Sequence, residues 1–218
     1  MTRQFETILF DLDGTILDTN ELIIRSYLHA LKGYVPADFS REHIIPHMGT
    51  PLYDQLRRFS GLEDVEELAK KYRAINLELH DEYVKTFEGV NEVVESLHKA
   101  GFKLGVVTTK IRLTTELGLK HVGIAPFMDA IVTIDDVTHA KPHAEPVLKA
   151  VELLQADKAT TLMIGDSTMD IHSGVNAGVK TVGVAWSLKG EHVLKEAGAD
   201  YIIHHMHDLY SIVGMENR

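Results

Sequence analysis

Six short apolar runs, rich in β-branched side chains, constrain the fold of this 218-residue chain more than any other feature. They are residues 7–10, 104–107, 130–134, 161–164, 181–184 and 201–203. Continuous apolar runs of this length are typical of strands buried on both faces of a sheet. Stretches with helical periodicity separate the later runs. This alternation predicts an α/β fold with a doubly wound, Rossmann-like parallel sheet, whose functional site lies beyond the carboxyl ends of the strands.

One segment interrupts the alternation of strands and helices. From residue 20 to about residue 83, the chain shows only helical periodicity, as in residues 21–31 and 65–79. We therefore predict a discontinuous α/β core, formed by residues 1–17 and 85–218, with residues 18–84 inserted as a helical cap domain. Two linkers join such an insert to its core, and together they can form a hinge.

The composition excludes several classes of function. Twenty-two Lys and Arg against 32 Asp and Glu give a formal charge of -10, which repels nucleic acids and anionic membranes. The chain has no cysteine, so disulfides, thiolate metal sites and cysteine nucleophiles are excluded. Residues 1–6 lack the features of a targeting segment, and no apolar run is long enough for a membrane helix. We expect a cytoplasmic protein without nucleic-acid or membrane partners.

Two carboxylates follow the first apolar run directly. Asp11 and Asp13 lie two residues apart at the predicted end of a strand, so both side chains point to the same side. Two negative groups in one crevice are costly unless a cation lies between them or one of them holds a proton. Gly14 lets the backbone turn sharply beside a bound ligand. For this motif alone, an ordinary turn capped by aspartate is the alternative.

A second carboxylate pair, Asp166 and Asp170, follows the apolar run at residues 161–164. Because the carboxyl ends of parallel strands meet at one edge of a sheet, we expect this pair to lie near Asp11. Oxygen ligands from Asp11, Asp166 and a main-chain carbonyl group suit Mg²⁺. A helix N-cap is the alternative explanation of this second motif.

Two further strand ends carry groups that suit a phosphoryl group. Thr108, Thr109 and Lys110 end one apolar run and offer hydroxyl groups and an ammonium group. Lys141 follows the next run after a short loop. Each has a structural alternative, since threonine at a strand end commonly satisfies the backbone and Lys-Pro commonly forms a solvated turn. The four polar strand ends together indicate a site for a phosphoryl group more specifically than any one of them does.

The four motifs together resemble those of the haloacid dehalogenase-like (HAD) phosphohydrolase superfamily. They read here as residues 11–15, Thr108, Lys141 and residues 166–170, and the resemblance extends over essentially the whole chain. The helical insert after the first motif is similar to the cap of the family's phosphoglycolate phosphatase and phosphomutase branches. The resemblance implies a hydrolase that uses Mg²⁺ and acts on a small phosphorylated substrate.

The resemblance also implies a role for each matching residue. Asp11 would attack phosphorus and form an aspartyl phosphate, while Asp13 would protonate the leaving oxygen and later activate water. Asp11, Asp166 and the main-chain carbonyl of Asp13 would bind the metal, and Asp170 would support the metal waters or Lys141. The implied catalytic residues are Asp11, Asp13, Thr108, Lys141 and Asp170, and the implied substrate-binding residues are Gly14, Thr108, Thr109, Lys110 and Lys141.

Further stretches resemble one subgroup, the bacterial inorganic pyrophosphatases of the PpaX type. These stretches are residues 19–23, 106–110, 133–137 and 185–190. The resemblance implies hydrolysis of pyrophosphate, which in that subgroup is released when the phosphocarrier HPr is dephosphorylated at serine. His143 is a departure, because the family commonly carries Asp after Lys-Pro.

Other functions stay open or are disfavoured. A phosphatase for a small phosphomonoester, such as phosphoglycolate, would share every core motif. A non-catalytic module that binds phosphorylated ligands is disfavoured because the four motifs are intact. Asp13 disfavours carbon–halogen cleavage, since the family's dehalogenases lack this carboxylate, and the absence of an Arg-rich loop at residues 49–53 disfavours a phosphomutase. The sequence does not distinguish a monomer from a homodimer.

Overall fold

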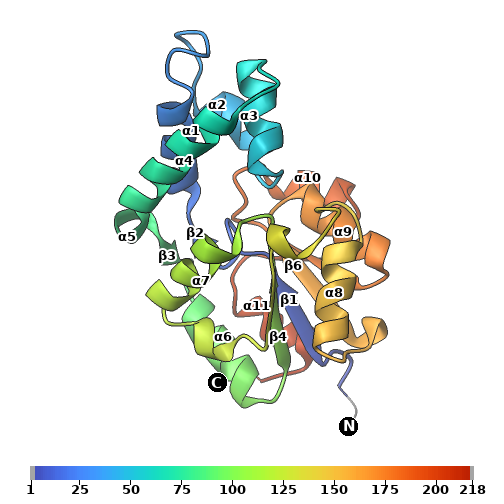
Figure 1. The fold of residues 1–218 in the computed structure, drawn as a ribbon. Helices are drawn as coiled ribbons and strands as arrows, with labels where there is room; N and C mark the ends of the chain where they lie inside the picture. The colour runs from blue at the N-terminus through green and yellow to red at the C-terminus, as the bar shows by residue number, and fades with distance from the viewer. Residues whose placement is uncertain (1–2, 217–218) are drawn as a thin grey trace.

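The computed structural model describes residues 3–216 and contains a parallel sheet of six strands (Figure 1). In spatial order the strands are β5 (Ala130–Val132), β4 (Lys103–Val107), β1 (Thr7–Phe10), β6 (Thr161–Gly165), β7 (Lys180–Val184) and β8 (Tyr201–Ile203). All neighbouring pairs are parallel. The α/β fold predicted from the apolar runs is therefore confirmed, and every predicted run overlaps one of these strands.

Alternate positions along the strands build two apolar layers. On β1, Ile8 and Phe10 pack into the layer that includes side chains of α6 (Val90–Lys99), α7 (Arg112–His121) and α11 (Asp208–Val213). Leu9 packs into the opposite layer, against α8 (Glu145–Leu153) and α9 (Thr168–Ala177). On that face α10 (Glu191–Glu196) contacts β7. Burial of both faces explains why the strands are continuously apolar.

Helix α9 begins at Thr168, shortly after β6 ends at Gly165. Ser167 is its N-cap, and the Ser167 hydroxyl and the Asp170 carboxylate form a capping box. Such a box satisfies main-chain N–H groups that have no partner inside the helix. The N-cap alternative for this motif is therefore correct, and it holds Asp170 in a fixed position at the edge of the sheet.

The segment between β1 and α6 is helical. Its helices are α1 (Asn20–Ala30), α2 (Arg41–Ile44), α3 (Leu52–Ser60), α4 (Glu66–Glu78) and α5 (His80–Tyr83). The chain leaves the core at β2 (Leu17–Asp18) and returns at β3 (Lys85–Thr86), which pairs with β2 in antiparallel fashion. Helices α1 to α4 share an apolar cluster of their own, which includes Tyr27 and Leu56.

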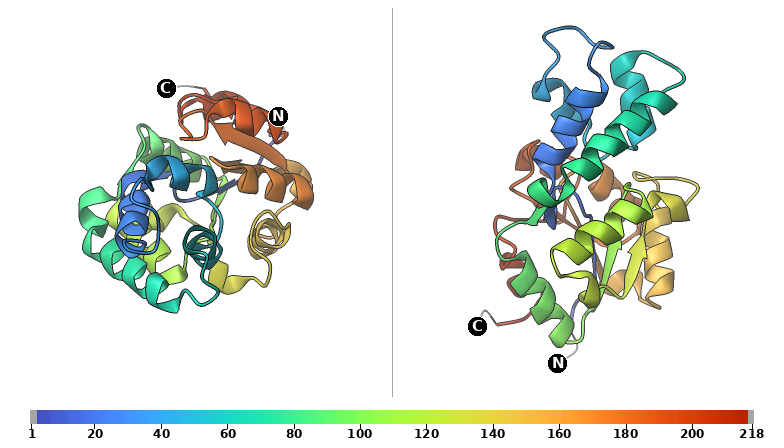
Figure 2. Two further views of the ribbon diagram at one scale, coloured as in Figure 1. Left: turned by 90° about the horizontal axis from the view of Figure 1, so that it is seen from above. Right: turned by 60° about the vertical axis from the view of Figure 1, so that its left-hand side comes forward.

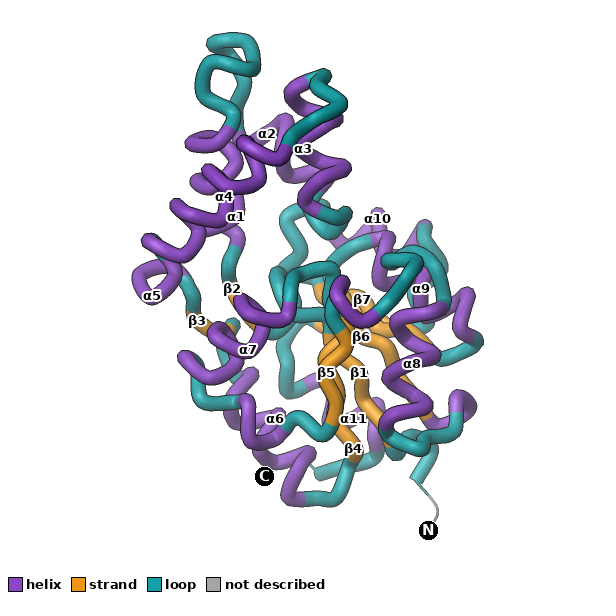
Figure 3. Tube along the Cα trace, in the orientation of Figure 1, coloured by secondary structure: helices purple, strands orange, loops and turns teal. Residues whose placement is uncertain are grey.

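The helical segment lies above the carboxyl edge of the sheet in Figure 1, and the second view in Figure 2 shows it as a separate layer. Figure 3 shows loops between this layer and the strand ends. The arrangement is compatible with a cap over residues 18–84, whose bounds stay a prediction. No helix within residues 3–216 has both the length and the apolar character needed to span a membrane.

Candidate active site

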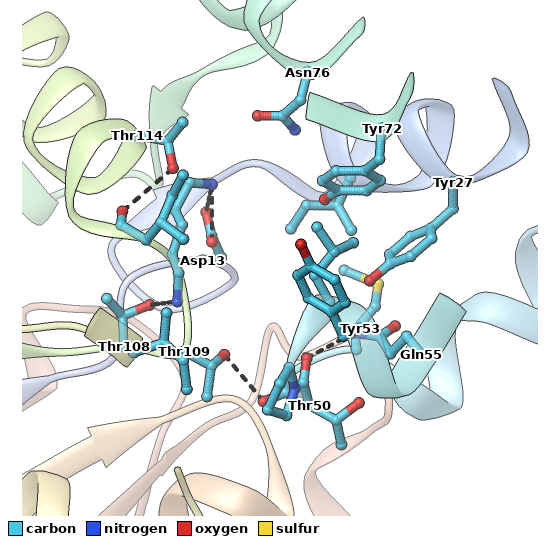
Figure 4. Close-up of a pocket in the computed structure, with 18 of the residues that line it drawn as sticks. Asp13, Tyr27, Thr50, Tyr53, Gln55, Tyr72, Asn76, Thr108, Thr109 and Thr114 are labelled. Carbon is cyan, nitrogen blue, oxygen red and sulfur yellow. Dashed lines mark hydrogen bonds and ion pairs between the residues drawn. The ribbon is translucent and has the colours of Figure 1, made fainter. Parts of the chain in front are cut away.

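A cavity of about 310 Å³ lies between the carboxyl edge of the sheet and the helical segment (Figure 4). The core contributes Asp11, Asp13 and Asp166, together with the predicted residues Thr108, Thr109 and Lys110. The helical segment contributes the rings of Tyr27, Tyr53 and Tyr72, which Figure 4 shows across the cavity from Asp13. Three of the four strand-end motifs therefore line one cavity, as their position in a parallel sheet predicts.

Lys141 lies behind Asp11 and is only 3% exposed. Its Nζ donates hydrogen bonds to Asp11 Oδ1 at 2.6 Å, to Asp170 Oδ1 at 2.5 Å and to the main-chain oxygen of Val107 at 2.9 Å. These three acceptors satisfy all three protons of the ammonium group. The alternative of a solvated Lys-Pro turn is wrong at this position. Neither Lys141 nor Asp170 lines the cavity, so any contact between Lys141 and a phosphoryl oxygen would replace one of these bonds.

Burial and two neighbouring negative charges shift the pKa of Lys141 in opposite directions. Burial lowers the pKa of the ammonium group, but the attraction of Asp11 and Asp170 and their hydrogen bonds outweigh burial, so the pKa is raised above its ordinary value. Lys141 is therefore a cation at neutral pH.

The pKa values of Asp11 and Asp166 are raised in the folded chain. For Asp11 the largest cause is burial, followed by the negative charge of Asp170. Burial is also the largest cause at Asp166 and raises its pKa to about 6, although the nearby Lys189 acts in the opposite direction. Both carboxylates are thus short of positive charge, and a bound cation would supply it.

The carboxylates of Asp11, Asp166 and Asp170 are close enough to share a metal ion. Their ligand oxygens lie within 4.8 Å of one another. Both oxygens of Asp170 are already engaged by Lys141 and Ser167, whereas no hydrogen bond from residues 3–216 reaches the Asp166 carboxylate. Asp11 and Asp166 are consequently the two side chains of this group that are available to a hard cation such as Mg²⁺.

Gly14 allows Asp166 to approach the loop after β1. Its φ is +85°, and a Cβ atom at this position would lie 2.7 Å from Asp166 Oδ2. Replacement of Gly14 by alanine would therefore push the Asp166 carboxylate out of place, in addition to the strain of a side chain in the left-handed region.

We expect Gly14→Ala to lower kcat by about 100-fold or more, because a displacement near 1 Å in such a site has an effect of this size. Gly33→Ala is the matched control, since Gly33 has a φ of +88° and no atom within 4 Å of the added Cβ. Both variants should show a similar fall in Tm from backbone strain, but only Gly14→Ala should lose activity in a steady-state assay. Equal activity of the two variants would contradict this role of Gly14.

Asp13 has different partners from Asp11. Lys110 Nζ donates to both carboxylate oxygens of Asp13 at 3.0 Å, and Thr19 Oγ1 donates to Oδ1 at 2.7 Å. Thr108 Oγ1 accepts a hydrogen bond from the main-chain nitrogen of Lys110 at 3.1 Å. The two aspartates that the sequence places together are therefore held by two different lysines, one behind the site and one inside the cavity.

The loop before α3 contacts the core through main-chain carbonyl groups. Lys189 Nζ donates to the oxygen of Met48 at 2.6 Å, and Thr109 Oγ1 donates to the oxygen of Gly49 at 3.2 Å. Thr109 is thus engaged by the helical segment. Lys189 is a cation near Asp166 that we did not predict individually, although it lies within one of the stretches that resemble the pyrophosphatase subgroup.

Several cavity residues of the helical segment are also not predicted from the sequence. Tyr72, Arg73 and Asn76 lie on adjacent turns of α4, and Figure 4 shows Tyr72 and Asn76 directed toward the cavity. The Arg73 guanidinium lies 5.5 Å from the centre of the Tyr53 ring. The available signal was the spacing of these polar residues on one face of the helix. Arg73 and Lys110 are the two basic residues among those that line the cavity.

Comparisons with known proteins agree with this geometry. A family model described as haloacid dehalogenase-like hydrolase matches residues 8–184. Pyrophosphatase PpaX of Bacillus velezensis is 48% identical over 98% of this chain and 99% of that protein. Pyrophosphatase PpaX of Anoxybacillus flavithermus is 48% identical over 97% of this chain and 98% of that protein. The crystal structure of a haloacid dehalogenase-like hydrolase from Bacteroides fragilis matches with a TM-score of 0.85 at 25% identity, over 94% of this chain and 99% of that chain.

Proposed function

Because this chain belongs to the haloacid dehalogenase-like hydrolase family, we propose that it is a Mg²⁺-dependent inorganic pyrophosphatase, which converts pyrophosphate and water to two phosphates. The observation that carries the proposal is the pair of cations, Lys110 and Arg73, that line the same cavity as Asp11 and Asp13. When pyrophosphate is cleaved, the leaving group is itself a phosphate anion. Cations beside the leaving group stabilise the charge that develops on it.

In the proposed first step, Asp11 attacks one phosphorus atom and the bond from that phosphorus to the bridging oxygen breaks. Lys141 holds Asp11 Oδ1 at 2.6 Å, so Oδ2 is the oxygen that is available to attack. Asp13 gives a proton to the bridging oxygen as it leaves, and Lys110 and Arg73 bind the departing phosphate. This step leaves an aspartyl phosphate on Asp11.

In the proposed second step, Asp13 takes a proton from water, which then attacks the phosphorus of the aspartyl phosphate. The bond between Asp11 and phosphorus breaks, the second phosphate leaves and Asp11 is restored. In the structure, Lys110 and Thr19 position the Asp13 carboxylate by three hydrogen bonds. Asp13 thus acts first as an acid and then as a base, as its position inside the cavity allows.

Asp11, Asp166 and the main-chain carbonyl of Asp13 would hold the metal ion. When bound, Mg²⁺ would neutralise part of the negative charge shared by the carboxylates and the substrate. The raised pKa values of Asp11 and Asp166 support this assignment, because they identify buried carboxylates that lack sufficient positive charge.

Removal of the metal should make stability depend on pH in a defined direction. Asp166 binds its proton more tightly in the folded chain, where its pKa is about 6, than at its ordinary value of 3.8. Its stabilising contribution is therefore complete below about pH 4 and is lost as the pH rises through 6. The loss should be on the order of 3 kcal/mol. The raised pKa of Asp11 acts in the same direction.

We expect the Tm of metal-free protein to fall between pH 4.5 and 7, and excess Mg²⁺ to reverse most of this fall at pH 7. Thermal unfolding followed by circular dichroism measures both effects. Asp166→Asn is the control, because it removes one of the two titrating groups and should reduce the pH dependence to the part that Asp11 contributes. A metal-free Tm that rises over this pH range would contradict the assignment.

A substrate assay tests the proposed activity. Initial rates should be measured with pyrophosphate, phosphoglycolate, sugar phosphates and nucleotides, each with Mg²⁺ and with a chelator. We expect the highest kcat/KM for pyrophosphate and no turnover with the chelator. A preference for a phosphomonoester would favour the alternative of a small-molecule phosphatase. No turnover of any substrate would favour a non-catalytic binding module.

A Lys110→Met variant further distinguishes a pyrophosphatase from a phosphatase that acts on small phosphomonoesters. If Lys110 binds a leaving phosphate, its loss should lower kcat/KM for pyrophosphate more than for a phosphomonoester with an uncharged leaving group. Lys149→Met is a control of the same chemistry, since Lys149 lies on α8, outside the cavity. Equal losses for both substrates would contradict the role of Lys110 in binding the leaving group.

A further inference from the structure

Two histidines and an aspartate come together where the second linker of the helical segment meets the core. His80 and Asp81 lie on α5, which directly precedes β3, and His121 is the last residue of α7. Figure 1 shows α5 and α7 side by side, and the ring centres of the two histidines are 5.5 Å apart. This cluster lies outside the catalytic cavity, and none of its members lines that cavity.

Nitrogen atoms of both histidines face one carboxylate oxygen. His80 Nδ1 lies 2.8 Å and His121 Nδ1 lies 3.5 Å from Asp81 Oδ1, and the three residues offer ligand atoms within 4.8 Å of one another. Two ligands of a tetrahedral Zn²⁺, each about 2.1 Å from the ion, are roughly 3.4 Å apart. The observed separations bracket this value, so small side-chain rotations would place all three atoms around one ion.

From this geometry we propose a second metal site, in which His80, Asp81 and His121 bind a divalent transition metal ion such as Zn²⁺. Two imidazole nitrogens and one carboxylate oxygen form a ligand set that suits Zn²⁺ and leaves the fourth position to water. The same set is poorly suited to Mg²⁺, which prefers oxygen ligands alone. The site is thus chemically distinct from the oxygen-rich group around Asp11.

The burial of the three residues suits a preformed site with an open entrance. His80 is only 2% exposed, which fixes its ring in place, whereas the side chain of Asp81 is 81% exposed and is accessible to an ion from solvent. His121 ends a helix, where main-chain carbonyl groups carry partial negative charge that favours a cation.

Metal binding would require the ring of His80 to change its tautomer. Without metal, Nδ1 donates its proton to Asp81, whereas with metal Nδ1 must be unprotonated and Nε2 must carry the proton. His80 Nε2 is buried and has no hydrogen-bond partner within the described residues. Metal binding would therefore break only the contact between Nδ1 and Asp81, which the metal replaces, but it would leave a buried Nε2–H group without an acceptor, and the metal–ligand bonds must offset this cost.

The proposed site would join the linker to the core. His80 and Asp81 precede β3, through which the chain returns from the helical segment, whereas His121 belongs to a helix of the core. A metal ion bound to all three residues would therefore restrain this linker. We expect bound Zn²⁺ to slow hydrogen exchange in residues 79–86.

The test is a Zn²⁺ titration in competition with a chromophoric chelator, in excess Mg²⁺ so that the oxygen-rich group is occupied. We expect His121→Ala and Asp81→Asn each to weaken binding of one Zn²⁺ by about 10- to 100-fold. His121 is preferred to His80 for substitution because the buried His80 contributes to packing. His29→Ala is the matched control, since His29 is an exposed histidine on α1 that belongs to no group of metal-binding residues within 3–216.

A second, exposed group formed by His139, His143 and Glu145 provides a specificity control. His143→Ala should leave the Zn²⁺ at His121 unchanged. Hydrogen exchange measured with and without Zn²⁺ should show slowing at residues 79–86 in the wild type but not in His121→Ala. The proposal is overturned if wild-type protein binds no Zn²⁺, if His121→Ala and Asp81→Asn bind it as tightly as wild type, or if only His143→Ala loses it.

Discussion

An Asp11→Asn variant should lose turnover of its substrate by at least about 10⁴-fold, as is usual when a covalent nucleophile is removed. An amide cannot form the acyl phosphate that the proposed mechanism requires. Lys141 should still find an oxygen acceptor at residue 11, where it now donates at 2.6 Å, so the side chain should stay in place. The measurement is kcat at saturating substrate and Mg²⁺.

The Asp11→Asn experiment needs a control for a general effect of removing one negative charge. Asp54→Asn serves this purpose, because Asp54 is an exposed residue of α3 whose one ion pair within residues 3–216 is with Arg57, across one helical turn. Asp54→Asn should retain nearly full activity. Both variants should give the circular dichroism spectrum of the wild type. Residual activity of Asp11→Asn above about one per cent would refute the nucleophilic role.

A Lys141→Met variant should lose about 3–5 kcal/mol of the free energy of unfolding, and activity with it. The substitution removes the partner of two buried carboxylates, Asp11 and Asp170, and leaves them uncompensated. Loss of the ammonium group should raise the pKa of Asp11 further. The variant should therefore be less stable at pH 8 than at pH 5. Urea unfolding at both pH values measures this difference.

Lys180→Met is a matched control for the loss of a lysine from an ion pair. Lys180 pairs with Asp200 at 2.5 Å, the same distance as between Lys141 and Asp170, but its side chain is largely exposed. An exposed pair contributes little, because water stabilises both charges after the pair is broken. If the two variants lose similar amounts of the free energy of unfolding, burial of the Lys141 side chain does not determine how much its ion pairs stabilise the protein.

The core of the fold could be predicted because its strands are buried on both faces. Continuous apolar residues, such as those of β1 and β6, are compatible with few other environments, and the helices between them require parallel connections. Short elements were harder to predict. Strands β2 and β3 have two residues each and carry no periodicity, so only their pairing in the folded chain identifies them.

The core side of the site was predictable for a related reason. Asp11 and Asp166 each follow a strand directly, Asp13 comes two residues after Asp11, and a parallel sheet brings such positions together whatever the rest of the chain does. The partners of Asp11 and Asp13 depend instead on side-chain conformation. The sequence alone does not indicate that Lys141 contacts Asp11 from behind while Lys110 contacts Asp13 inside the cavity.

The residues that the helical segment contributes to the cavity could largely not be predicted from the sequence. Arg73 lines the cavity, whereas Arg25 and Arg57 lie on neighbouring helices and do not, yet all three are basic residues of amphipathic helices. Which of them faces the core depends on how the helices pack against one another. That packing is set by the apolar cluster around Tyr27, which is specified by side-chain shape more than by periodicity.

The contacts of Lys189 and Thr109 with the loop at Met48 and Gly49 have a consequence for the evolution of substrate range. Both contacts end on main-chain oxygens, which every amino acid supplies. Side chains of the loop can therefore be exchanged without loss of these two anchors, except at Gly49, whose φ of +97° and closeness to Ser167 favour glycine. Thr50 and Pro51 line the cavity. Mutation at these two positions can therefore change the shape of the cavity while the loop stays attached to the core.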